Sequence, residues 1–198
     1  MIQAVVFDLD GVLYFETALF GARLARDHGI PRSAFSAFYS SDFQDCLVGK
    51  ADLKERLAPK LKEWGWTQGV DAFLRYWFND GSHDPALLAF VQELKAKGVR
   101  CYLCTNNERY RVEHLTKKLS LDRVFHGVLA SCALGVKKPE PALFAAICAR
   151  TGLPPEEIAF CDDDPEHVAA AERAGFRAIR FTTLEDLKQR LAELGVNL

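Results

Sequence analysis

The sequence predicts an α/β fold: a doubly wound parallel sheet with an α-helical insertion after its first strand. From Pro85 onward, apolar strand-like segments alternate with amphipathic helical segments, which is typical of a parallel sheet covered on both faces by right-handed crossovers. Before that point, residues 14–83 show helical periodicity and no convincing strand. We therefore expect a core domain made of residues 1–13 and 84–198 and an inserted helical domain of residues 14–83.

Composition limits the classes of protein. The 198 residues are 49% apolar and 26% charged, which suits a globular chain of one domain with an insertion. A net charge of −2 favours neither nucleic acid nor an anionic membrane as a partner. No apolar run approaches the roughly 20 residues of a membrane span, and we expect no signal peptide, since the sequence enters a strand directly. We expect a cytoplasmic monomer or homodimer.

The first strand ends in two carboxylates. Val5, Val6 and Phe7 are followed by Asp8 and Asp10, two positions apart, and then by a glycine. Ligands bind at the carboxyl ends of strands in open α/β sheets. Two carboxylates held so close repel each other unless a cation such as Mg²⁺ lies between them. The alternative is that both aspartates cap a turn and the glycine supplies a positive φ.

The insertion is expected to contain about four helices. Leucines recur at a spacing of four from Leu53 to Leu61, and aromatic residues are frequent throughout. Most of these aromatic residues are expected to form the core of the insertion. The turn signal Asn79-Asp80-Gly81-Ser82 returns the chain to the main domain. Breaks between the helices are expected near Pro31, Gly49 and Gly65-Trp66.

The second half of the chain follows a regular order. Helices tend to begin with proline in the first turn and end at glycine, as the segment from Pro85 to Gly98 illustrates. Helices are expected at Pro85–Lys97, Glu108–Leu119, Pro139–Arg150, Asp164–Ala174 and Leu184–Leu194. Strands are expected at Val99–Cys104, Gly127–Ala130, Ile158–Cys161 and Ala178–Phe181.

Polar residues follow the next two of these strands. Thr105 and Asn106 offer a hydroxyl, an amide and backbone N–H groups that suit a phosphate. The alternative, which the cluster taken alone favours, is that they cap the next helix. Lys138 stands directly before Pro139, where a lysine can neutralise phosphate oxygens and a nucleophilic carboxylate together. Alternatively, Lys137 and Lys138 are solvated surface charges.

A third cluster, Asp162-Asp163-Asp164, follows the Ile158 strand. Helix capping explains Asp164, which precedes a proline, but it does not explain Asp162 and Asp163. A cation shared with the aspartates of the first strand would relieve their mutual repulsion.

Cysteines and histidines carry no separate motif. Cys101 and Cys104 have the spacing of a redox pair but lie in a strand, where residues three apart face opposite sides, so we expect small buried side chains. The five histidines show no metal-ligand spacing and are expected on surfaces or rims.

These clusters together resemble the four motifs of the haloacid dehalogenase-like (HAD) hydrolases. The similarity covers the whole chain in the right order. The helical insertion resembles the α-helical cap of subfamily I, and the double aspartate resembles the phosphatase variant of the fourth motif. The matching segments are Phe7-Asp8-Leu9-Asp10-Gly11-Val12-Leu13, Leu103-Cys104-Thr105-Asn106, Gly135-Val136-Lys137-Lys138-Pro139 and Phe160-Cys161-Asp162-Asp163.

The resemblance implies a role for each matched residue. Asp8 is the expected nucleophile. Asp10 is the expected general acid/base, and it also offers its backbone carbonyl to Mg²⁺. Thr105 and the backbone around Asn106 are expected to hold the transferring phosphoryl group, and Lys138 is the third-motif lysine. Asp163 is the expected direct Mg²⁺ ligand, with Asp162 beside it or acting through water.

The implied activity is that of a Mg²⁺-dependent phosphatase acting on a small phosphorylated metabolite, such as a sugar phosphate, through an aspartyl-phosphate. Asp10 favours a phosphatase over a dehalogenase, because only an alkoxide leaving group needs a proton. One alternative is a phosphotransferase or phosphomutase with the same phosphoenzyme. The other is a non-catalytic ligand sensor on the same scaffold.

Substrate selection is expected to lie in the insertion, since the four motifs contact only phosphoryl group and metal. Gln44, Gly49 and Lys50 are the polar candidates there. Lys50→Ala is expected to raise KM for an anionic substrate.

Overall fold

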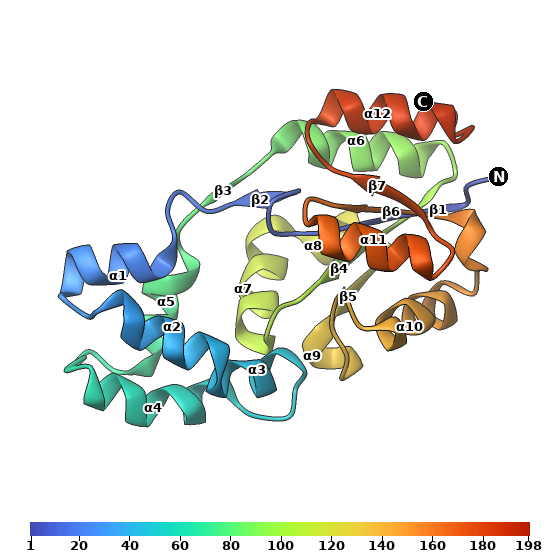
Figure 1. Cartoon of the computed structure of the whole chain (residues 1–198). Coiled ribbons are helices and arrows are strands. Elements are labelled where there is room, and N and C mark those ends of the chain that lie inside the picture. Colours follow the sequence, from blue (N-terminus) through green and yellow to red (C-terminus); the bar gives the residue numbers. More distant parts are fainter.

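The computed structural model describes all residues, 1–198, and contains a five-stranded sheet in the order β5-β4-β1-β6-β7 (Figure 1). All neighbouring strands in this sheet are parallel, which confirms the predicted α/β class. β1 lies in the centre, paired with β4 on one side and β6 on the other. The strands are β1 Ala4–Phe7, β4 Arg100–Thr105, β5 Gly127–Ala130, β6 Ile158–Asp162 and β7 Arg177–Arg180.

Helices cover both faces of the sheet. Successive β1 side chains alternate, so that Val5 and Phe7 pack with α6, α7 and α12, whereas Ala4 and Val6 pack with α10 and α11. Each face therefore buries its own apolar cluster. The helices of this part are α6 Pro85–Ala96, α7 Arg109–Leu119, α8 Leu121–Val124, α9 Ser131–Leu134, α10 Pro141–Thr151, α11 Pro165–Arg173 and α12 Leu184–Glu193, with a 3₁₀ turn at Pro155–Glu157.

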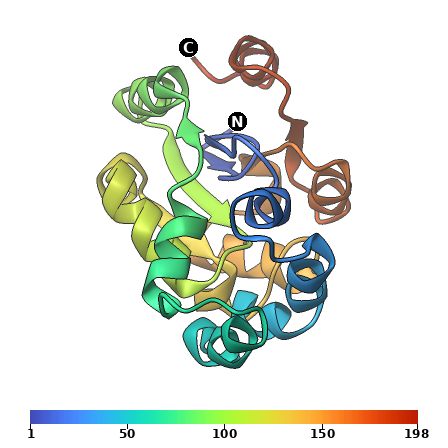
Figure 2. The ribbon, with the colours of Figure 1, turned by 90° about the vertical axis from the view of Figure 1, so that its left-hand side faces the viewer.

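Residues 20–78 form five helices that lie together to one side of the sheet (Figures 1 and 2). This helical segment has a separate core of 15 buried side chains, many of them aromatic. Two short strands join it to the sheet-containing part and pair antiparallel with each other, β2 at Tyr14–Phe15 and β3 at Ser82–His83. The helices are α1 Phe20–His28, α2 Arg32–Ser40, α3 Asp42–Leu47, α4 Leu53–Glu63 and α5 Val70–Phe78.

The helical segment differs from the prediction in two ways. It has five helices instead of about four, because Ser41 breaks the backbone between α2 and α3 without a proline or glycine to signal it. The paired linkers β2 and β3 were not predicted, since two residues are too few to show an alternating pattern. The division into two domains stays a prediction.

The sheet-containing part follows the predicted order with small shifts. Its strands lie within one residue of the predicted bounds. The helix expected from Pro139 begins at Pro141, and α8 and α9 are single turns too short to predict. All six cysteines are free, and none of the helices has the length and apolarity needed to cross a membrane.

Candidate functional site

The carboxyl ends of β1 and β6 place two aspartates around one buried lysine. Asp8 directly follows β1, and Asp162 is the last residue of β6. The Nζ atom of Lys138 lies 2.6 Å from Oδ1 of Asp8 and 2.7 Å from Oδ2 of Asp162. All three residues are buried, with Lys138 only 2% exposed. The alternative that Lys138 is a solvated surface charge is therefore excluded.

Asn106 holds the backbone of this lysine in place. Its side-chain carbonyl accepts a hydrogen bond from the Lys138 N–H, and its side-chain N–H donates to the Lys138 carbonyl, both at 2.9 Å. The loop after β5 is thereby fixed against the loop after β4. Asn106 thus positions the ammonium group that bridges the two aspartates.

Asp10 has a different partner from Asp8. Both oxygens of Asp10 accept from the guanidinium of Arg111 at 2.6 Å, and one also accepts from the Asn107 amide at 2.8 Å. Because β1 ends at Phe7, the alternation of a strand no longer governs Asp10. Each of the two carboxylates is thus paired with a different basic side chain, Asp8 with Lys138 and Asp10 with Arg111.

The sequence interpretation missed Arg111. This residue lies in the first turn of α7 and is buried, and its guanidinium also donates to Asn107. Asn107 in turn donates to the hydroxyl of Thr105 at 2.6 Å, so that this predicted phosphate ligand belongs to the same network. Only the tertiary approach of α7 to the end of β1 reveals the role of Arg111.

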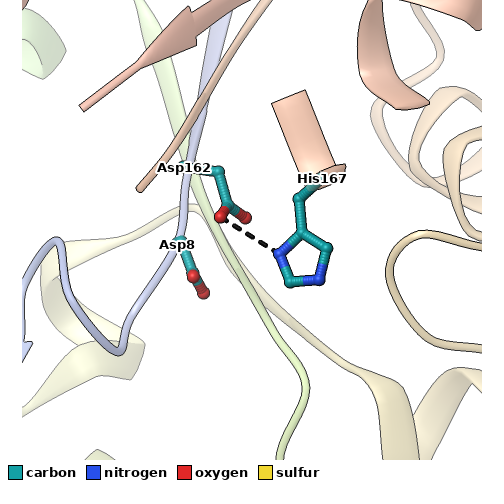
Figure 3. A group of neighbouring side chains, drawn as sticks. All are labelled: Asp8, Asp162 and His167. Atoms are coloured by element: carbon teal, nitrogen blue, oxygen red, sulfur yellow. Dashed lines mark hydrogen bonds and ion pairs between the residues drawn. The ribbon is translucent and has the colours of Figure 1, made fainter. Parts of the chain in front are cut away.

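His167 from α11 completes the surroundings of Asp162. Its Nδ1 lies 3.1 Å from Oδ1 of Asp162 (Figure 3). The backbone N–H of Asp164 donates to the same oxygen. The candidate ligand atoms of Asp8, Asp162 and His167 lie within 4.8 Å of one another (Figure 3). His167 was expected on a surface or rim, and the structure instead places its ring against a buried carboxylate.

Asp163 lies against the turn that follows β1. A Cβ atom on Gly11, whose φ is +85°, would lie 2.3 Å from Oδ2 of Asp163, so the close approach requires glycine. Asp163 makes no ion pair in the structure. The three carboxylates of Asp8, Asp162 and Asp163 thus have a single lysine beside them, Lys138, which pairs with the first two. This surplus of carboxylate oxygen fits a hard divalent cation.

Burial and charge shift the pKa values in this network. Burial raises the pKa of Asp8 to about 7, with Asp162 adding to the rise and Lys138 opposing it. Burial also raises the pKa of Asp163, and Asp162 adds to it. Burial would raise the pKa of Asp10 too, but the Arg111 guanidinium dominates and holds it below its ordinary value. Asp8 shares its single cationic partner, Lys138, with Asp162, and Asp163 has no ion pair, whereas both oxygens of Asp10 contact the Arg111 guanidinium.

A cavity of about 730 Å³ opens above these residues, between the sheet edge and the helical segment. Its floor contains five polar side chains: Asp10, Asn106, Asn107, Arg111 and Asp163. Its wall is largely aromatic, with Tyr14, Phe15, Phe20, Phe35, Tyr39, Phe43 and Trp77.

The polar candidates of the insertion lie elsewhere. Gln44 accepts from the Nζ of Lys137 at 2.6 Å and so links α3 to the loop before Lys138. Lys50 lines a second cavity of about 380 Å³, together with Asp52 and Tyr110. Lys50 does not line the cavity above Asp10. The substrate contact expected of this lysine stays a prediction.

Comparison with known proteins agrees with this geometry. A family model for haloacid dehalogenase-like hydrolases matches residues 2–175. The phosphoglycolate phosphatase of Mannheimia succiniciproducens is 28% identical over 144 residues, covering 70% of this chain and 64% of that protein. The glyceraldehyde 3-phosphate phosphatase of Methanopyrus kandleri is 27% identical over 204 aligned residues, covering 91% of this chain and 84% of that protein.

A solved structure shares the fold. The HAD-family enzyme of Bacteroides thetaiotaomicron, crystallised with magnesium and inorganic phosphate, matches with a TM-score of 0.83 at 18% identity. The match covers 96% of this chain and 98% of that one.

Proposed function

This chain belongs to the haloacid dehalogenase-like hydrolases, and we propose that it is a Mg²⁺-dependent phosphatase that hydrolyses a small phosphorylated metabolite through an aspartyl-phosphate on Asp8. The observation that carries the proposal is the state of the Asp8 carboxylate. Its Oδ1 accepts from the Leu9 N–H and the Lys138 ammonium, both at 2.6 Å, while no protein group donates to Oδ2. One oxygen is therefore anchored and the other is free to attack.

The reaction proceeds in two balanced steps. Oδ2 of Asp8 attacks phosphorus, the ester P–O bond breaks, and the leaving oxygen takes a proton from Asp10. Water then attacks the phosphorus and gives a proton to Asp10, and the bond to Asp8 breaks to release inorganic phosphate. The Arg111 pair favours the ionised form of Asp10, so the protonated Asp10 that begins the first step gives up its proton readily, and the carboxylate that remains accepts the proton of water in the second step.

Several residues have supporting roles in this proposal. Lys138 and the Thr105 hydroxyl would hold the phosphoryl oxygens. Asp8, Asp163 and the backbone carbonyl of Asp10 would hold Mg²⁺, with Asp162 acting through water because its oxygens are occupied by Lys138 and His167. Bound there, Mg²⁺ would neutralise charge that develops on the transferring phosphoryl group.

The curated relatives support the substrate class. Both relatives named above are phosphatases of small phosphorylated compounds. The helical segment, which covers the cavity from the side opposite Asp10, would act as the cap that selects the leaving group.

Phosphate release from a panel of phosphate esters tests the proposal, with Mg²⁺ and with EDTA. Asp8→Asn should abolish metal-dependent release, and Asp122→Asn, an exposed control on α8, should leave it unchanged. Retained activity in Asp8→Asn would refute the phosphoenzyme route. Product analysis with a second sugar present separates hydrolysis from phosphoryl transfer.

A further inference from the structure

Beyond the phosphoryl site, the wall of the cavity above Asp10 is largely aromatic. We propose that it selects substrates whose leaving group is a flat, largely apolar alcohol, such as an arylmethanol, over hydroxyl-rich sugars. This inference rests on the proposed phosphatase function and names the substrate class of the same site.

Exposed apolar side chains gather at this cavity. Only five large hydrophobic side chains of the whole chain are exposed, and two of them, Met1 and Leu198, are the terminal residues. The other three are Leu19, Tyr39 and Phe15, exposed by 70%, 45% and 40%, and all three line the cavity. Leaving apolar side chains exposed to water is unfavourable, so a group of them at one place on the surface indicates a binding site.

The three side chains come from separate parts of the chain. Phe15 lies in β2, Leu19 precedes α1, and Tyr39 lies near the end of α2. Tyr39 is held by stacking on the ring of Phe43, with centroids 4.8 Å apart and planes at 27°. The fold thus presents a rigid aromatic surface to the cavity, and a second flat ring can continue the same stack.

The size of the cavity and its few free polar groups agree with such a ligand. About 730 Å³ is far more than a phosphoryl group needs and falls in the range of small-molecule pockets. Above the floor, the charged or hydroxyl-bearing side chains besides tyrosine are Glu16, Arg32 and Ser36, and Glu16 faces Arg111 at 3.4 Å. A polyol would lose the hydration of several hydroxyls against aromatic rings and would find only a few side chains in the wall with which to regain hydrogen bonds.

Phosphate esters of different primary alcohols distinguish binding of the leaving group in the cavity from the reactivity of the ester. Ethyl, 2-naphthylmethyl and glucose 6-phosphates all expel a primary alkoxide, so differences in kcat/KM report contacts with the leaving group. We expect 2-naphthylmethyl phosphate to exceed both others by at least about tenfold, the order of discrimination that an apolar pocket supplies. A higher kcat/KM for glucose 6-phosphate would overturn the inference.

Tyr39→Ser then identifies the surface. It should lower the ratio of kcat/KM for 2-naphthylmethyl phosphate to that for ethyl phosphate by about tenfold. Leu198→Ser removes an equally exposed apolar side chain away from the cavity and should leave the ratio unchanged. An equal loss on both esters in Tyr39→Ser would mean that the side chain only supports the helical segment, and would overturn the inference.

The two proposals fail in different ways. If no ester is hydrolysed with Mg²⁺ and Asp8→Asn changes nothing, the phosphatase function itself is wrong. If esters are hydrolysed and Asp8→Asn abolishes this, but the order favours the sugar phosphate, only the leaving-group inference is wrong.

Discussion

Glu108 offers a quantitative test of the electrostatics beside the site. This residue caps α7, and its carboxylate accepts from the backbone N–H groups of Tyr110 and Arg111. Glu108 is only 2% exposed, and burial raises its pKa from 4.5 to about 7 in spite of these hydrogen bonds. The folded protein therefore holds a proton on Glu108 between pH 4.5 and 7, whereas the unfolded chain does not.

The sign of the pH dependence follows from this difference. Because the folded state binds the extra proton, the contribution of Glu108 to the free energy of unfolding falls as pH rises from 4.5 to 7 and then stays level. The shift corresponds to about 3 kcal/mol. Glu108→Gln keeps a capping oxygen but does not titrate, so the variant should gain about 3 kcal/mol relative to wild type between pH 4.5 and pH 8.

Thermal unfolding at several pH values measures this gain. For a chain of this size the relative Tm of Glu108→Gln should rise by about 6–12 °C across that interval. Glu113→Gln, an exposed glutamate of the same helix, is the matched control and should follow wild type. A difference between Glu108→Gln and wild type that does not change with pH would refute the assignment of a buried, proton-binding Glu108.

Two further substitutions test the metal and lysine contacts. Gly11→Ala places a methyl group 2.3 Å from the Asp163 carboxylate at a φ of +85°, so Asp163, a proposed Mg²⁺ ligand, has to move. The Mg²⁺ concentration for half-maximal activity should therefore rise, and an unchanged Mg²⁺ titration would contradict this. Lys138→Met leaves Asp8 and Asp162 buried without a countercharge and should cost about 3–5 kcal/mol of unfolding free energy in EDTA. Urea unfolding measures the loss, and the double variant with Asp8→Asn should regain part of it.

Sequence reasoning predicted the fold because its signals are local and repeated. Strand and helix periods alternate from Pro85 onward, and proline and glycine mark the helix ends. The clusters around Asp8, Lys138 and Asp162 could be predicted to meet, because parallel strands deliver their carboxyl ends to one edge.

The missed features depend on contacts between distant segments. Arg111 looks like an ordinary helix-surface charge until α7 brings it to Asp10. Glu108 stands at the predicted start of a helix, and its sequence neighbourhood does not show that it is buried. The aromatic residues of the insertion were expected to form its core, as Phe38 and Phe73 do. Periodicity shows which residues share a helix face, but it does not show whether that face packs on the core or, as with Tyr39, lines a cavity.

The central place of β1 affects how the chain assembles during synthesis. β1 pairs with β4 and β6, and Ala4 lies opposite Arg100 and Ile158 in the two ladders. At ribosomal rates of 5–20 residues per second, roughly 8–30 seconds separate the synthesis of β1 from that of its second partner. The helical segment is made entirely within that interval and carries its own core, so it can fold first, while the strand that precedes Asp8 waits unpaired.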